Sequence, residues 1–266
     1  MLGSLGRYAR LTGHTALEIT SLPLAAVKGY VLEAPRGKRL VVRSTVNQVY
    51  FTAVEPLPLY FAIATLLGFV VLAASDGLLR PLGLAQWVSA LSARLVVCEL
   101  VPLVFALVLT GRSGVAIATE LGSMRVNQET AALDVLGVNL DYFLLLPRLV
   151  GVTVAAVALT AMAPLGLAAG WVIGRLLGVI SASLGLVALI EALDPLLVLE
   201  ALAKSALLGL ALAAINCYHG LKVGRSATGI PKANVRGSVQ AYLACFVIAA
   251  SGSLLSVLRF SSGAHP

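Results

Sequence analysis

The chain has 266 residues, of which 59% are hydrophobic and only 12% are charged. Soluble domains contain about 25% charged residues, so this chain has too few polar side chains to cover a water-soluble globule, and its composition indicates an integral membrane protein. The composition excludes a disordered chain. With only three cysteines, the chain is not a disulfide scaffold. The cysteines and the three histidines lack the spacing of metal ligands, so we expect no metal or other cofactor. The net charge of +7 therefore concerns membrane topology, and we expect no nucleic-acid partner.

The first 45 residues are basic and carry seven Lys and Arg residues between scattered Leu and Val residues. They lack the continuous apolar core and the small-residue cleavage site of a signal peptide. This pattern favours an amphipathic helix in the cytoplasmic headgroup layer, with a frayed basic tail as the alternative. We predict an interfacial segment at residues 1–45 and a transmembrane domain at residues 46–266.

Five apolar stretches follow, each close to or above the roughly 20 residues that a helix needs to cross a bilayer. The predicted fold class is therefore an all-α integral membrane protein. The five expected spans are residues 56–74, 91–109, 143–173, 195–218 and 239–258.

The positive charges alternate from loop to loop. Fourteen of the 19 Lys and Arg residues precede residue 45 or lie in the stretches 111–148 and 219–237. The positive-inside rule places these regions in the cytoplasm and the C-terminus outside.

Small residues recur every fourth position in the third span and just beyond its end, and again in the fourth span, which places each set on one helix face. Such stripes favour close helix packing, either within the chain or across a dimer. The two stripes are Gly166, Gly170, Gly174 and Gly178, and Ser205, Gly209, Ala213 and Cys217.

Two charged residues lie deep inside the expected spans. Glu99 is about two turns into the second span, and Lys204 is about two turns into the fourth, one turn after Glu200. A charge at membrane depth costs about 2.5 to 3.5 kcal/mol on insertion scales, so both side chains should face a partner or a cavity in the outer half of the membrane. They either form an ion pair that fixes helix register or line a polar part of a substrate path.

The cytoplasmic stretch 111–148 contains a short predicted helix. Asn127 is expected to cap it, Gln128 and Glu129 to occupy its first turn, and Gly137 to end it in a left-handed conformation. Its surface is apolar but too short to span a membrane, so the helix needs a partner. The apolar residues are Ala132, Leu133, Val135 and Leu136.

Several of these residues recur in the order and spacing of a known family. The chain resembles the MlaE/YrbE permeases, the membrane subunits of lipid-transporting ABC importers or exporters associated with MCE proteins, over roughly residues 45 to 260. The first matching block is Glu99, Leu100, Pro102, Gly111, Arg112, Gly114, Glu120, Gly122, Met124, Arg125, Glu129, Ala132, Leu133, Gly137, Pro147 and Arg148; the second is Lys204, Ser205, Gly220, Gly229, Arg236 and Val239.

The resemblance implies a permease in the bacterial inner membrane, with an N-terminal interfacial helix and five spans. It implies three protein partners: a cytoplasmic ABC ATPase, a second permease copy that is identical or a paralogue, and an MCE-domain lipid-binding protein. Glu99 and Lys204 are then expected to border a lipid cavity between the two permease copies. A coupling helix region is expected to dock in a groove of the ATPase through Glu120, Gly122, Met124, Arg125, Gln128, Glu129, Ala132, Leu133, Leu136 and Gly137.

The chain differs from the family pattern at several positions, and these differences bear on which lipid it binds. Cys98 stands where many relatives have Arg, the last span has no acidic residue, and no Pro follows Gly137. A more neutral cavity suits a different lipid or a sterol.

No Walker A motif is present, so ATP hydrolysis is expected in a separate subunit and no catalytic residue in this chain. An ion-coupled secondary transporter and a non-transporting membrane scaffold are the alternatives. The first would be expected to show coupling carboxylates and often an internal repeat, and the second leaves the charged residues without a purpose.

Overall fold

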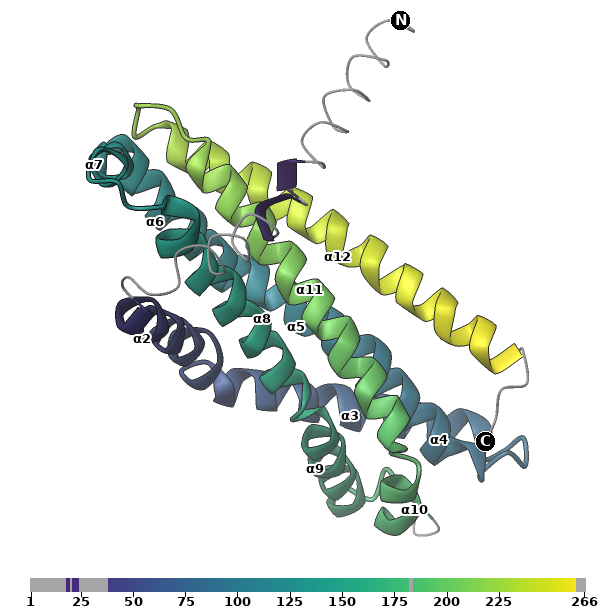
Figure 1. The fold of residues 1–266 in the computed structure, drawn as a ribbon. Helices are drawn as coiled ribbons and strands as arrows, with labels where there is room; N and C mark the ends of the chain where they lie inside the picture. The colour runs from purple at the N-terminus through teal and green to yellow at the C-terminus, as the bar shows by residue number, and fades with distance from the viewer. Residues whose placement is uncertain (1–17, 20, 24–37, 182–183, 262–266) are drawn as a thin grey trace, which may run out of the picture. The chain divides into compact units, whose positions relative to one another are not determined.

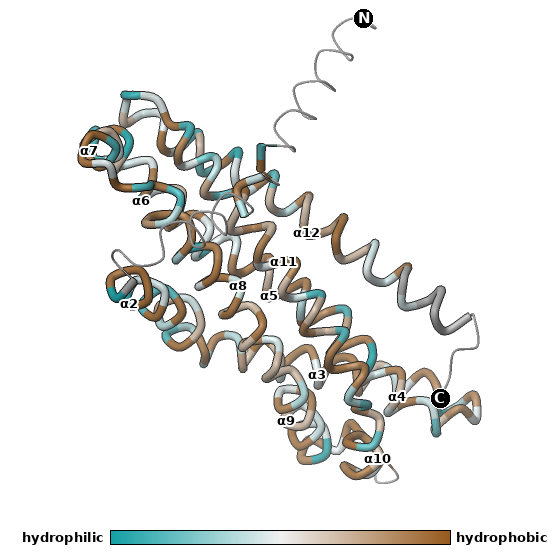
Figure 2. The backbone as a smooth tube through the Cα atoms, in the orientation of Figure 1, coloured by the Kyte–Doolittle hydropathy of each residue, from teal (hydrophilic) through white to brown (hydrophobic). Residues whose placement is uncertain are grey.

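The computed structural model of the protein describes residues 18–19, 21–23, 38–181 and 184–261 (Figure 1). Within these ranges all regular secondary structure is helical, and the long helices are hydrophobic along most of their length (Figure 2). In the described residues, five helical stretches are long and apolar enough to cross a membrane, which confirms the predicted fold class. They are Leu57–Leu79, Trp87–Val126, Asp141–Leu176, Pro195–Leu221 and Gly229–Leu254.

In the part of the chain that the structure describes, four short π-helical segments, written η, interrupt or adjoin the α-helices. The first part of the chain forms α2 (Lys38–Val49), η1 (Tyr50–Val54), α3 (Leu57–Leu79), α4 (Trp87–Ala93), η2 (Arg94–Leu100), α5 (Val101–Leu109), η3 (Thr110–Gly114) and α6 (Val115–Val126). The second part forms α7 (Glu129–Val135), η4 (Asp141–Leu145), α8 (Leu146–Thr160), α9 (Ala163–Leu176), α10 (Leu186–Glu191), α11 (Pro195–Leu221) and α12 (Gly229–Ser261).

The second span is much longer than the sequence predicted. Its helix continues from Trp87 to Val126, about 60 Å at 1.5 Å per residue, whereas the hydrocarbon core of a bilayer is about 30 Å thick. The stretch 111–148 therefore begins as a continuation of the helix that forms the second span. Helix α6 persists because Ile117, Ala118 and Leu121 are buried against the rest of the protein.

The third span is divided into two helices, which the sequence analysis treated as one. Helix α8 ends at Thr160, and α9 begins at Ala163 with a proline, Pro164, in its first turn. Proline has no backbone N–H and fits the start of a helix better than its interior. The break at residues 161–162 follows from this position of the proline.

Contacts group the described residues into two compact units. Unit 1 contains the described residues up to Val49 together with Thr110–Val152 and Leu210–Leu243, and unit 2 contains Tyr50–Leu109, Thr153–Gly209 and the residues from Ala244 onward. Helices α8, α11 and α12 contribute residues to both units.

Unit 2 is organised by the packing of α9 on α3 (Figure 1). A Cβ atom added to Gly170 would lie 2.4 Å from the Phe69 backbone nitrogen, and one added to Gly166 would lie 2.4 Å from the Ala64 Cβ. The glycine stripe thus packs within the chain and not across a dimer. Gly178 does not belong to it: this residue has a φ of +68° and follows the C-terminus of α9.

Unit 1 includes α2 and the ends of several long helices. Gly220 of α11 lies against α6, because a Cβ atom on it would be 2.9 Å from the Leu121 Cβ. Helix α2 exposes Leu40, Val42 and Val46 and continues across residue 45, where we predicted a segment boundary. Most of the predicted interfacial segment, residues 1–17, 20 and 24–37, lies outside the described residues.

Candidate functional site

A buried ion pair joins three helical segments of unit 2. The Lys204 Nζ on α11 lies 2.9 Å from the Glu99 Oε2 on η2, and only 4% of the Lys204 side chain is exposed against 24% of that of Glu99. Nζ also donates to the Cys98 carbonyl oxygen at 3.1 Å, and the Ser253 hydroxyl on α12 donates to the same Glu99 oxygen. The two charges predicted from the sequence therefore meet, and the ion-pair interpretation describes their contact correctly.

The local backbone brings these groups together. Glu99 is in the π-helical segment η2, where the Val101 N–H bonds to the Val96 carbonyl five residues earlier instead of four. The extra residue in this turn changes which side chains face α11. On α12, a Cβ atom on Gly252 would lie 2.6 Å from the Lys204 Cε, so the missing side chain makes room for the lysine stem.

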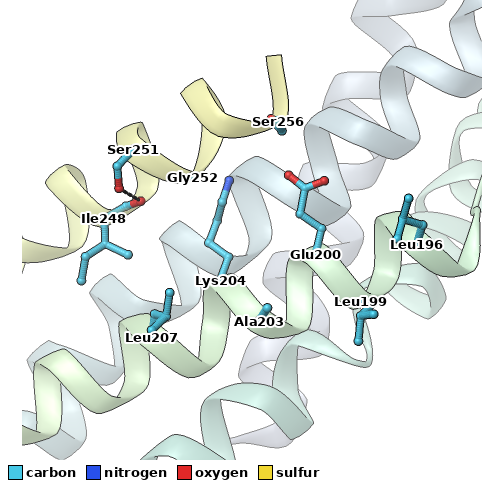
Figure 3. Close-up of a pocket in the computed structure, with 10 residues that line it drawn as sticks. All are labelled: Leu196, Leu199, Glu200, Ala203, Lys204, Leu207, Ile248, Ser251, Gly252 and Ser256. Carbon is cyan, nitrogen blue, oxygen red and sulfur yellow. Dashed lines mark hydrogen bonds between the residues drawn. The ribbon is translucent and has the colours of Figure 1, made fainter. Parts of the chain in front are cut away.

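A groove between α11 and α12 lies beside the ion pair, with a cavity volume of about 350 Å³. Glu200 and Lys204 extend from α11 on the same side, one turn apart (Figure 3). The remaining lining is largely aliphatic, so the α11–α12 groove combines an apolar wall with a charged edge. It is lined by Leu196, Leu199, Glu200, Ala203, Lys204, Leu207, Ile248, Ser251, Gly252 and Ser256.

The predicted coupling residues fall in two adjoining helices of unit 1. Glu120, Gly122, Met124 and Arg125 lie in α6, and Glu129, Ala132 and Leu133 lie in α7. The side chains of Val135 and Leu136 are 88% and 75% exposed, whereas Leu133 is half-buried. The expected apolar surface is thus present at the end of α7, although its role in coupling stays a prediction.

The caps of this segment differ from the sequence expectation at its start. Asn127 ends α6 instead of capping α7, and its side-chain amide donates to the Glu129 carboxylate at 3.3 Å. Gln128 precedes α7 with a φ of +60°, an uncommon conformation for a residue with a side chain. The expected left-handed glycine is confirmed at Gly137, whose φ is +71°.

A second ion pair connects α6 with α8 in unit 1. The Arg148 Nη2 lies 2.8 Å from the Glu120 Oε1, and the Arg148 Nη1 donates to the Leu144 carbonyl at 2.6 Å. Arg148 is buried, while 59% of the Glu120 side chain is exposed. The sequence offered both residues as motif positions but gave no signal that they pair.

Sequence reasoning also missed Ser253 and Gly252. Both are uncharged residues in a span that was described as having no charge, so neither differed from the ordinary small residues of a membrane helix. Among the described residues, no group of three or more His, Cys, Asp or Glu side chains could hold a metal ion.

Comparison with known proteins identifies the family to which the chain belongs. The family profile described as "Permease MlaE" matches residues 45–255. The chain is 27% identical over 228 residues to the Arabidopsis thaliana protein named TRIGALACTOSYLDIACYLGLYCEROL 1, chloroplastic, which covers 85% of this chain and 65% of that protein.

Bacterial relatives match a shorter part. A probable ABC transporter permease protein of Synechocystis sp. is 32% identical over 163 residues, covering 61% of each chain. One of Rickettsia bellii is 28% identical over 163 residues, covering 61% of this chain and 62% of that protein. The chain thus matches just under two thirds of the length of these curated relatives.

Proposed function

Because the chain belongs to the MlaE permease family, we propose that it is the membrane subunit of an ABC transporter that moves lipids between the bacterial inner membrane and an MCE-domain partner in the periplasm or cell envelope. A separate cytoplasmic ATPase hydrolyses the ATP. The observation that carries the lipid assignment is the α11–α12 groove, where aliphatic side chains lie beside the buried pair Lys204 and Glu99.

An amphiphile fits this arrangement. Acyl chains match the leucine side chains of the groove, and a polar headgroup matches its charged edge, where Glu200 and Lys204 lie one turn apart. The Arabidopsis relative is named after a galactolipid, which supports a lipid substrate. Lys204 and Glu99 then have two roles. Their mutual neutralisation stabilises the helices, and their polar atoms border the lipid.

A second permease copy completes the cavity in this proposal. The groove volume of about 350 Å³ lies at the low end of the range for small-molecule pockets, about 300 to 1,000 Å³, so one chain does not enclose a diacyl lipid. The glycine stripe of α9 no longer supports a dimer, since it packs on α3. The argument for two copies therefore rests on the size of the groove.

The ATPase binds the exposed end of α7. Val135 and Leu136 are too exposed to stabilise this chain, and covering them with a partner removes their apolar surface from water. The positive charge of the flanking loops supports a cytoplasmic location for this end, with the N-terminus on the same side and the C-terminus outside.

The direct test is purification of the chain from its native membrane in mild detergent, followed by mass spectrometry of the bound proteins and lipids. We expect an ABC ATPase, two permease chains and a copurified lipid, with lipid transport in proteoliposomes that depends on ATP. Transport by a complex that lacks an ATPase, driven by an ion gradient instead, would contradict the proposal.

A substitution in α7 tests the ATPase contact. Replacing Val135 with Asp puts a charge into an apolar contact, so the ATPase should be lost from the purified complex while the permease stays folded. Val235 on α12 is 64% exposed, and Val235→Asp is the matched control that should keep the ATPase. Retention of the ATPase at wild-type stoichiometry by Val135→Asp would show that α7 is not the docking helix.

A further inference from the structure

A second pocket lies in unit 1 where the α6–α7 junction meets the α11–α12 loop, with a cavity volume of about 210 Å³. Among the residues that the structure describes, two arginines and no acidic residue border it. We call it the arginine pocket; its lining residues are Arg125, Gln128, Thr130, Ala131, Val223, Gly224 and Arg225.

Within the described part of the chain, no ion pair neutralises the charges of the arginine pocket. Arg225 forms no ion pair or hydrogen bond within the described part of the chain, and the Arg125 guanidinium makes one hydrogen bond, to the Thr130 hydroxyl at 3.4 Å. Thr130 itself is only 1% exposed. Two guanidinium groups at one pocket repel each other, so an anion between them lowers the electrostatic energy, and a carboxylate matches their planar donors.

The position along α6 distinguishes the source of that anion. The charge-free stretch of the second span, residues 100–111, ends at Arg112. From Arg112 to Val126 the helix advances about 21 Å, whereas the headgroup layer on one side of a bilayer is about 5 to 8 Å thick. The pocket therefore lies beyond the lipid headgroups, where a water-soluble protein reaches it more easily than a membrane lipid does.

Helix α7 connects the pocket to the proposed docking surface. Thr130 and Ala131 at its start line the pocket, and Val135 at its end exposes an apolar side chain. A protein that covers Val135 also extends over the pocket, because the seven residues of α7 span only about 10 Å.

We propose that the arginine pocket receives an aspartate or glutamate side chain of the ATPase subunit. This proposal rests on the proposed function and adds to it the chemistry of the contact: an apolar groove for α7 with an acidic residue at its edge. It also adds a second segment of this chain to the interface, the α11–α12 loop around Gly224 and Arg225.

Charge reversal tests the pocket. The permease is reconstituted in nanodiscs of uncharged phosphatidylcholine, and the Kd for the purified ATPase that copurifies with it is measured at low and high salt. Arg125→Glu and Arg225→Glu should each weaken binding at least about tenfold, with a smaller effect at high salt. The matched control Lys232→Glu reverses an exposed charge on α12 outside the pocket, and it should change the Kd less than about twofold. Unchanged thermal stability shows that each variant is folded.

A charge swap identifies the partner residue. Acidic residues around the α7-binding groove of the ATPase are changed to Arg one at a time, and one of them should restore binding to Arg225→Glu. If Lys232→Glu weakens ATPase binding as much as the arginine variants do, the effect is a general electrostatic attraction between the subunits, and the assignment of the arginine pocket is wrong. Unchanged ATPase affinity in both arginine variants would also overturn it. In that case, a loss of bound phosphatidylglycerol in native mass spectra of the same variants, purified from membranes that contain this lipid, would assign the anion to a lipid. If the wild-type chain binds no ATPase, the proposed function itself fails.

Discussion

The Lys204 site of unit 2 and the arginine pocket of unit 1 differ in whether their positive charges are neutralised. In unit 2, the Lys204 ammonium is buried and is neutralised by Glu99 at 2.9 Å. In unit 1, the arginine pocket has two guanidinium groups and no acidic lining residue. A charged side chain in the hydrocarbon layer needs an ion-pair partner for its helix to be stable there. A charged side chain in water can remain unpaired, and it is then available to bind another subunit. Changes in unit 2 should therefore affect stability first, and changes at the α7 end of unit 1 should affect assembly first.

The largest expected loss of stability comes from Lys204→Met. This change leaves the Glu99 carboxylate without its cation and should destabilise the protein by about 3 to 5 kcal/mol, measured as a lower thermal midpoint in detergent. The double variant Glu99→Gln with Lys204→Met should recover most of that stability, because no charge is left unpaired. Lipid transport by the double variant should stay low. Recovery of both properties would show that the pair has only a structural role.

Gly170→Ala should have the next largest effect. The added methyl group meets backbone atoms of α3 at 2.4 and 2.7 Å, and such overpacking costs about 1 to 3 kcal/mol. The matched control is Gly77, which lies in α3 itself and has open space at its Cβ position. Gly77→Ala should therefore stabilise the helix by about 0.5 to 1 kcal/mol. Thermal unfolding of the pair is the measurement, and equal tolerance of both changes would contradict the close packing of α9 on α3.

Glu120→Gln should have a smaller effect than Lys204→Met, although both break an ion pair. The glutamine amide oxygen can still accept a hydrogen bond from the buried Arg148 guanidinium, which also keeps its bond to the Leu144 carbonyl, so the expected loss is about 1 to 2 kcal/mol. Thermal unfolding is the measurement. If Glu120→Gln destabilises the protein as much as Lys204→Met does, the two ion pairs do not differ in their importance for stability.

The smallest effect is expected at Glu18, which lies 2.7 Å from the Lys222 Nζ in unit 1. The hydrogen bond to Glu18, followed by one to Tyr218, raises the Lys222 pKa above its ordinary value of 10.5. While the Glu18 carboxylate is ionised, the contact therefore contributes fully below pH 10.5, and it is lost as the pH rises through the raised pKa of Lys222. Thermal midpoints of the wild type and Glu18→Gln should differ slightly at neutral pH and converge at alkaline pH; a constant difference would exclude this linkage.

The sequence predicted the features that depend on hydrophobicity and on the cost of a buried charge. The five spans follow from apolar stretches, and the meeting of Glu99 with Lys204 follows from the energy of leaving either in lipid. The positive φ of Gly137 was also predictable, because a glycine at a helix end commonly adopts it.

Other features depend on packing that no local pattern reports. Helix α6 continues beyond the membrane because its small and apolar residues pack in unit 1, and a hydropathy argument places its limit at the bilayer instead. Gln128 with positive φ and the Ser253 contact to Glu99 are determined by neighbours distant in sequence. Arg225 was counted in the sequence as one of several cytoplasmic cations, and only the fold brings it to the same pocket as Arg125.

The π-helical segment at Arg94–Leu100 makes the second span sensitive to its number of residues. Deleting one residue there would return the segment to ordinary α-helical phase and rotate one side of the span by about 100° relative to the other. The hydrophobicity of the span would hardly change, and the Glu99 carboxylate would turn away from Lys204. In an alignment of homologous permeases, a single-residue gap in this segment is therefore a change of site geometry, even where every charged residue is retained.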